Sequence, residues 1–186
     1  MSTGCVTDGE LVERARTGDT EAFDELARRH GAAVYRAALA ALGSASDAED
    51  IAQEALVLAY RSLGSYRGDA SFKTWVVAIA WKRALNLRRR WWRLRPLEDE
   101  RGSLYEPVLD TPSAEQILLA GERDRAAKRL IQKLPARLRD ALLCVATTEH
   151  SYEELAVILG VPSGTLKWRV SEARRRVKQK LAKQGF

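Results

Sequence analysis

Apolar residues recur every three or four positions along most of this chain, and that helical period limits the fold more than any other feature of the sequence. Alternating runs of β-branched residues between turn pairs, which would predict strands, are almost absent. We therefore expect an all-α protein. The periodic segments place its helices at 8–17, 20–42, 47–63, 71–91, 114–133, 136–147, 151–159 and 163–182.

The helical pattern breaks between Arg95 and Thr111. This stretch contains two prolines, a Gly-Ser pair and five carboxylates against two arginines. Proline and scattered polar residues are typical of a linker. We expect two small helical domains, residues 1–94 and 114–186, joined by a flexible acidic linker over residues 95–113.

Basic residues are concentrated at the end of each predicted domain. Residues 82–95 contain seven basic residues and no acid, and residues 163–183 contain eight basic residues and one acid. A single run of charge is usually a solvated surface. Two runs, one in each domain, with an acidic spacer between them and a net charge of +6, favour a nucleic-acid partner.

The chain contains few residues that could bind a metal or act as a nucleophile. Its only cysteines and histidines are Cys5, Cys144, His30 and His150, and no two of them have the spacing of metal ligands. Without a phosphate-binding loop or a catalytic constellation, we expect neither an enzyme nor a bound metal or cofactor. Residues 1–10 lack the features of a signal peptide, no apolar run approaches the roughly 20 residues of a membrane span, and the few cysteines suit a reducing cytosol.

Residues 151–182 have the features of a helix-turn-helix. Ser151 and Glu154 form a capping box, Gly160 and Pro162 end the short first helix, and Ser163 is expected to cap a longer basic helix. A short helix, a tight glycine-containing turn and a basic second helix together predict a DNA-binding module.

The second helix of this module has two different sides. One side is apolar, with Leu166, Val170, Ala173 and Val177. The opposite side contains Gly164, Trp168, Ser171 and Arg175, with Glu172 beside them. A tryptophan opposite the apolar stripe favours insertion of this side into the major groove, with flanking phosphates bound by Lys167, Arg169, Arg174 and Arg176. The alternative is that Trp168 packs on a neighbouring helix or a partner protein.

The helix at 47–63 also has an unusual outer side. Ser46 and Glu49 are expected to form its capping box. Its outer side mixes polar and apolar residues: Asp50, Gln53, Glu54, Val57, Tyr60 and Arg61. A solvated surface and a protein-docking face with an apolar centre both agree with this pattern.

The helix at 71–91 is apolar nearly all round and basic at its end, so it is expected to be buried between neighbours or covered by a partner. Tryptophans beside arginines provide stacking surfaces and charge for single-stranded nucleic acid. Trp75 is expected in the core, whereas Trp81, Trp91 and Trp92 could contact nucleic acid or close the domain.

Two segments resemble a known family. DAEDIAQEALVLAYRSLGSYRGDASFKTWVVAIAWKRALNLRRR, residues 47–90, resembles the sigma-2 domain of extracytoplasmic-function (ECF) sigma factors, and LPARLRDALLCVATTEHSYEELAVILGVPSGTLKWRVSEARRRVKQKL, residues 134–181, resembles their sigma-4 domain. The resemblance implies a sigma-70-family protein that binds core RNA polymerase and directs promoter recognition and transcription initiation. A stand-alone helix-turn-helix regulator is the alternative.

The resemblance also implies roles for individual residues. The residues matching the polymerase-docking face are Asp50, Gln53, Glu54, Val57 and Tyr60. Those matching the minus-10 binding region are Ser65, Tyr66, Arg67, Gly68, Asp69, Lys73, Lys82, Asn86 and Arg89. Those matching the minus-35 binding region are Ser163, Thr165, Lys167, Trp168, Arg169, Ser171, Glu172 and Arg175. Lys82 and Asn86 depart from the family, which often has Asn and Asp there, so the minus-10 preference is open.

The implied partners are core RNA polymerase, through the clamp helices of its largest subunit and its flap, together with promoter DNA and an anti-sigma factor. The implied location is the cytoplasm, with the protein either free or sequestered at the inner membrane by a membrane-bound anti-sigma factor.

Overall fold

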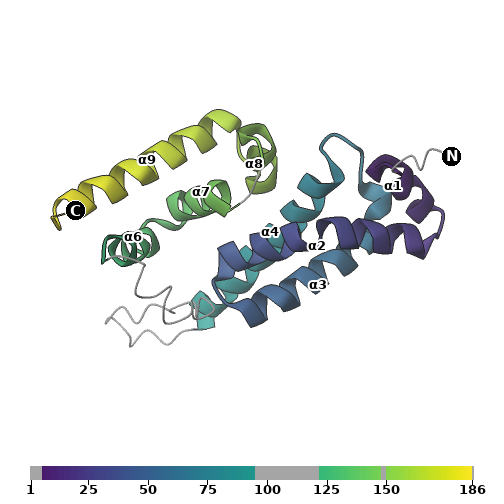
Figure 1. The fold of residues 1–186 in the computed structure, drawn as a ribbon, viewed down its shortest axis with the longest axis horizontal. Helices are drawn as coiled ribbons and strands as arrows, with labels where there is room; N and C mark the ends of the chain where they lie inside the picture. The colour runs from purple at the N-terminus through teal and green to yellow at the C-terminus, as the bar shows by residue number, and fades with distance from the viewer. Residues whose placement is uncertain (1–5, 95–121, 148–149, 186) are drawn as a thin grey trace.

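The computed structural model describes residues 6–94, 122–147 and 150–185. Every regular element in these ranges is a helix (Figure 1), which confirms the all-α prediction. The predicted linker at 95–113 and the first part of the predicted helix at 114–133 lie outside the described residues. The domain boundaries at residues 94 and 114 therefore stay a prediction.

The N-terminal half consists of α1 (Asp8–Arg16), α2 (Thr20–Leu42), α3 (Ala45–Arg61), the short 3-10 helix η1 (Leu63–Ser65) and α4 (Phe72–Leu94). Helices α2, α3 and α4 pack side by side, and α1 lies against α2 (Figure 1). Small side chains on their facing sides let helix axes approach closely. The buried alanines include Ala37, Ala38, Ala48, Ala55, Ala59, Ala80 and Ala84.

The helix ends in this half follow from local side-chain hydrogen bonds. Thr7 and Glu10 form a capping box at the start of α1, and the Asp19 side chain accepts the Ala22 N–H at the start of α2. Gly43 ends α2 with a φ of 76°, a left-handed conformation that glycine adopts without a Cβ penalty.

The predicted capping box at Ser46 and Glu49 is wrong. Ser44 is the N-cap residue of α3, and its hydroxyl accepts the Asp47 N–H. Because Gly43 turns the chain and leaves Ser44 extended, α3 begins at Ala45 rather than at residue 47.

The C-terminal half consists of α6 (Glu122–Gln132), α7 (Ala136–Thr147), α8 (Tyr152–Leu159) and α9 (Ser163–Ala182). Both hydrogen bonds of the predicted capping box at Ser151 and Glu154 are present, and Gly160 ends α8 with a φ of 63°. The helix-turn-helix is therefore confirmed. Ser163, however, does not cap α9: Pro162 occupies the N-cap position and Ser163 is the first helical residue. The proline ring has no oxygen that could accept a backbone N–H, so the helix begins without a side-chain cap.

The two halves pack directly against each other, with α8 against α4 and α7 against α2. In Figure 1, α7 and α8 lie between α9 and the N-terminal bundle. Residues of α7 and α8 belong to the same buried cluster as Trp81 and Val77 of α4; they include Ala141, Cys144, Leu155 and Ile158. Removal of these apolar side chains from water stabilises the contact.

Polar interactions between described residues also cross this interface. The buried Thr74 hydroxyl on α4 donates to Glu154 Oε1 on α8 at 2.8 Å. Arg88 Nη2 on α4 pairs with Asp140 Oδ1 on α7 at 2.5 Å, and Arg88 Nη1 donates to the Ala41 carbonyl at 2.8 Å. Only 15% and 14% of the Arg88 and Asp140 side chains are exposed, so this pair is largely shielded from solvent.

Candidate polymerase and nucleic-acid interfaces

The outer side of α3 presents all five predicted polymerase-docking residues together. Asp50, Gln53 and Glu54 are exposed, and Val57 and Tyr60 remain 50% and 40% exposed. A purely solvated surface rarely contains two such apolar side chains side by side, so their exposure favours a docking face. We call these five residues the α3 face.

Two residues of the α3 face contact neighbouring helices. The Tyr60 ring packs edge-on against Phe23 of α2, with ring centroids 5.0 Å apart. Glu54 forms an ion pair with Arg83 of α4. Both partners of that pair are about half exposed, so it contributes little to stability and leaves the carboxylate accessible to a partner.

The loop between α3 and α4 holds the predicted minus-10 residues Ser65 to Asp69. Ser65, Arg67, Gly68 and Asp69 are exposed, whereas Tyr66 is half-buried. The Tyr66 hydroxyl donates to the Ala70 carbonyl at 2.7 Å, and its ring packs against Phe72 and Trp75 with centroids 5.9 Å and 5.2 Å away. Gly68 has a φ of 82°, which the turn of the loop requires. Tyr66 thus fixes the loop, and its neighbours face solvent.

The predicted minus-10 residues of α4 do not all lie together. Lys82, Asn86 and Arg89 are exposed and fall on one side of the helix at about 100° per residue, in line with the half-buried Trp75 and Ile79. We call these five residues the α4 stripe. Lys73 lies nine positions before Lys82, which places it on the opposite side of the helix.

The structure decides between the alternatives for Trp81. Trp81 is fully buried and belongs to the core. Trp91 is partly buried and packs against the same cluster. The side chain of Trp92 lies outside the described residues. Trp75, expected in the core, is half-buried and contacts the rings of Tyr66 and Phe72.

On α9, Leu166, Val170 and Ala173 are buried and Trp168 is 63% exposed. Within the described residues, Trp168 therefore does not pack into a neighbouring helix. Ser171 and Arg175 are also exposed, whereas Ser163, Thr165 and Arg169 are half-buried. Lys167 lies 3.5 Å from the Glu153 carboxylate and above the Tyr152 ring.

Glu172 orients two arginines of α9. Its carboxylate accepts two hydrogen bonds from Arg175, at 2.7 Å and 2.8 Å, and one from Arg176 at 2.7 Å. These hydrogen bonds lower the pKa of Glu172 to about 2. We call Trp168, Ser171, Glu172 and Arg175 the recognition face; its arginine is held in a fixed, bidentate geometry.

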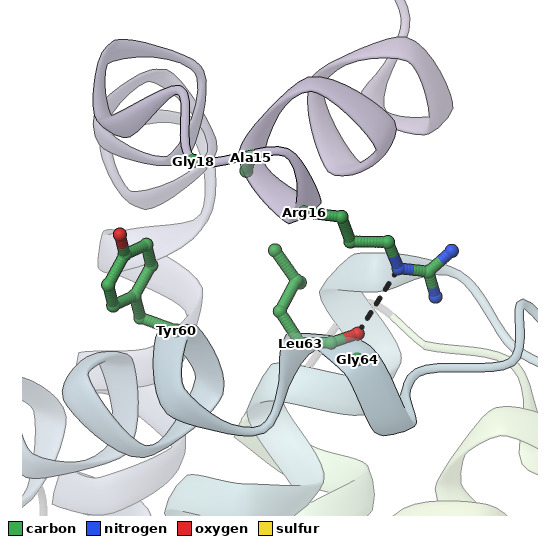
Figure 2. Close-up of a pocket in the computed structure, with 6 residues that line it drawn as sticks. All are labelled: Ala15, Arg16, Gly18, Tyr60, Leu63 and Gly64. Carbon is green, nitrogen blue, oxygen red and sulfur yellow. Dashed lines mark hydrogen bonds between the residues drawn. The ribbon is translucent and has the colours of Figure 1, made fainter.

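Arg16, at the end of α1, has a role that the sequence pattern did not indicate. Its Nε donates to the Leu63 carbonyl at 3.3 Å, and its Nη2 donates to the Tyr66 carbonyl. Figure 2 shows Arg16 reaching Leu63 at the edge of a cavity whose other side is formed by Tyr60. The only signal in the sequence is a basic residue in the last turn of a helix, which is common.

The described residues show no group of three or more His, Cys, Asp or Glu side chains that could bind a metal ion. Among the same residues, no helix is both long and apolar enough to cross a membrane.

Comparison with known families gives a match for each half. Residues 26–94 match the model of Sigma-70 region 2, and residues 124–177 match that of Sigma-70, region 4. The RNA polymerase sigma-H factor of Pseudomonas aeruginosa is 34% identical over 180 residues, which cover 94% of this chain and 93% of that protein. The ECF RNA polymerase sigma-E factor of Escherichia coli K12 is 34% identical over 186 residues, covering 95% of each chain.

Two solved structures have the same fold. CnrH in complex with the cytosolic domain of CnrY has a TM-score of 0.65 and 26% identity, covering 94% of this chain and 97% of that one. The sigma factor RpoE in complex with the anti-sigma factor NepR from Bartonella quintana also has a TM-score of 0.65, with 28% identity over 87% of this chain and 96% of that one. Together with the two family matches and the nearly full-length relatives, these likenesses show that the chain belongs to the ECF sigma factors of the sigma-70 family.

Proposed function

We propose that this sigma factor uses three separate surfaces. The α3 face docks on the clamp helices of the largest polymerase subunit. The loop at 65–71 and the α4 stripe hold one melted strand of the minus-10 element, and the recognition face of α9 contacts the minus-35 duplex. The observation that supports this most strongly is that apolar side chains remain exposed on both halves, each beside charged residues: Val57 and Tyr60 on α3, and Trp168 on α9.

The α4 stripe suits a melted strand better than a duplex. Trp75 and Ile79 offer a partly exposed apolar surface, and Lys82 and Arg89 supply positive charge beside it. Stacking surfaces next to cations are what single-stranded DNA binding requires. Extracting a base from the stack costs a few kcal/mol, which the exposed loop next to the stripe offsets with direct contacts. Lys73, on the opposite side of α4, contacts DNA only if the strand also passes along that side of the helix.

The recognition face suits a duplex. A 20-residue helix such as α9 is about 30 Å long, and its exposed residues extend well beyond α8. Trp168 offers apolar contact to thymine methyl groups, and the pair with Glu172 holds Arg175 on the same side of α9, where the N–H groups not bonded to Glu172 face the DNA. Ser163, Thr165, Lys167 and Arg169 surround these two residues and contact the flanking backbone.

This chain performs no catalysis in the proposed mechanism. The polymerase supplies the nucleotidyl transfer and, through its flap, a second contact to the C-terminal half. The location is the cytoplasm. An anti-sigma factor keeps the protein inactive, in keeping with the two structurally similar sigma factors, which were solved with CnrY and NepR.

The stand-alone regulator gives no role to the N-terminal half, which matches Sigma-70 region 2. An electrophoretic mobility shift with a promoter fragment tests the proposal directly. We expect specific binding only when core polymerase is present. Equal specific binding by the protein alone would favour the regulator.

A further inference from the structure

The loop between α3 and α4 is tied to α1 through one side chain. Arg16 is the last residue of α1, and its guanidinium donates to the Leu63 carbonyl at 3.3 Å and to the Tyr66 carbonyl. These two carbonyls lie at the beginning of η1 and directly after its end. One planar group therefore fixes both ends of the turn that leads into the loop.

The guanidinium is itself held in place. Arg16 Nη1 pairs with Glu13 Oε1 at 2.5 Å, one helical turn earlier on α1. The Arg16 side chain is 29% exposed and forms one wall of the cavity in Figure 2, with Leu63 and Gly64 beside it. All three nitrogens thus have an acceptor, and the planar geometry of the group sets the distance between the two carbonyls.

The bonds made by Arg16 complement those made by Tyr66. The Tyr66 hydroxyl donates across the loop to Ala70, and its ring contacts Phe72 and Trp75 at the start of α4. Arg16 holds the backbone of the same residue from the other side. Tyr66 is therefore anchored at its ring, its hydroxyl and its carbonyl, and the exposed residues 67–69 extend from an anchored residue.

We propose that Arg16 is a positioning residue for minus-10 recognition. It does not contact DNA; it holds the loop in the conformation that accepts an unstacked base, so that the strand binds without first ordering the loop. This inference rests on the proposed function, because it assumes that the loop at 65–71 binds the minus-10 element.

The test uses the full chain with core polymerase and a promoter library randomised in both elements. Transcripts are sequenced to give base preferences at each position. We expect Arg16→Ala to lower the preference at minus-10 positions roughly three- to tenfold, the factor that one or two hydrogen bonds are worth. Preferences in the minus-35 element, and the amount of polymerase bound in a pull-down, should stay at the wild-type level.

Two further variants make the test specific. Arg14→Ala is the matched control, because Arg14 lies on the same helix and pairs with Asp19 at 2.7 Å away from the loop; it should leave every preference unchanged. Arg16→Lys keeps the charge and most of the stem but cannot reach two carbonyls with one planar group. It should therefore lower the minus-10 preference as Arg16→Ala does. If the alanine variant fails to fold, the lysine variant alone tests whether Arg16 positions the loop.

Other outcomes would overturn the inference. Unchanged minus-10 preferences in both Arg16 variants would mean that the loop does not depend on this residue. A uniform decrease in transcripts with preferences intact would mean that Arg16 only stabilises the fold. In both cases the proposed function stands, because the wild-type preferences remain. If wild type shows no preference in either element, the proposed function itself fails.

Discussion

Trp81 and Trp168 have opposite environments, although each lies in a helix rich in basic residues. Trp81 is completely buried, whereas 63% of Trp168 is exposed. A buried tryptophan stabilises the core, and replacing one with alanine typically costs about 3–5 kcal/mol. Replacing an exposed tryptophan changes the stability of the fold little, so its contribution to DNA binding can be measured separately from folding.

We expect Trp168→Ala to weaken binding of the polymerase complex to minus-35 duplex by about 1–3 kcal/mol without lowering the melting temperature. The change removes an apolar contact to the major groove. Fluorescence anisotropy with labelled duplex measures the affinity. Val157→Ala is the control, since Val157 is 53% exposed on α8. Equal losses in the two variants would show that the recognition face has been assigned incorrectly.

Glu172 is predicted to limit non-specific binding. Glu172→Gln removes a negative charge and frees Arg175 and Arg176 from their pairs, so each can bind phosphate. We expect tighter binding to random duplex and a steeper salt dependence, by about one unit of slope for each additional phosphate that the variant neutralises. A salt titration of the affinity measures this slope, and an unchanged slope would contradict the role.

The effect of Glu172 should be constant from about pH 5 to about pH 8 and should be lost only in acid. The carboxylate has a folded pKa of about 2, below its ordinary 4.5, so its pairs with the arginines are fully formed above 4.5 and are lost only as pH falls toward 2. Wild type and Glu172→Gln should therefore differ by the same factor at about pH 5 and about pH 8. A difference that changes within that range would mean that the pair is weaker than its geometry indicates.

Among the helices, α3 provides the sharpest test of polymerase docking. Asp50→Arg combined with Glu54→Arg reverses two charges on the α3 face and places an arginine beside Arg83, the present partner of Glu54. We expect polymerase binding in a pull-down to be abolished and the circular dichroism spectrum to be unchanged, because both side chains are exposed.

Glu21→Arg with Asp24→Arg is the matched control for that variant. It makes the same change of charge on exposed positions of α2. If the control variant loses polymerase binding to the same extent as the α3 variant, net charge rather than the α3 face determines binding. If the α3 variant retains polymerase, the docking face lies elsewhere.

Most helix positions could be predicted from periodicity, and the bounds of α2, α7 and α9 agree with the expected 20–42, 136–147 and 163–182. The errors concern caps. Ser44, Ser46 and Ser163 are equally suitable N-cap residues by type, and the choice depends on backbone conformation set by Gly43 and Pro162. The bonds from Arg16 to the loop could not be predicted, because they join residues about 50 positions apart.

At the scale of the whole molecule, the direct packing of the two halves was not predicted. Periodicity shows that a face is apolar but not which neighbour covers it, so the burial of Cys144 and Ile158 in one cluster with residues of the N-terminal half could not be predicted. The packing has a functional consequence. The α4 stripe lies in one half and the recognition face in the other, and the two promoter elements that they are proposed to contact lie about 25 base pairs, or about 85 Å of B-DNA, apart. We therefore expect the halves to separate when the protein binds both elements.

Removing the polar contacts between the halves should favour the separated form. Thr74→Val with Asp140→Asn retains side-chain volume but removes the donor to Glu154 and the charge that pairs with Arg88. We expect a larger radius of gyration in small-angle X-ray scattering and faster association with core polymerase. Arg14→Ala, which removes an exposed ion pair, should change neither. An unchanged radius in the double variant would mean that the apolar contact alone keeps the halves together.

Run-off transcription with purified core polymerase and a randomised promoter library tests the central claim most directly. We predict that adding this protein produces transcripts from templates that share two conserved sequence elements at a fixed spacing. The loop and the α4 stripe recognise one element, and α9 recognises the other. Transcripts that start at no defined site, or that share one element only, would contradict an account in which the two halves each bind one part of the promoter.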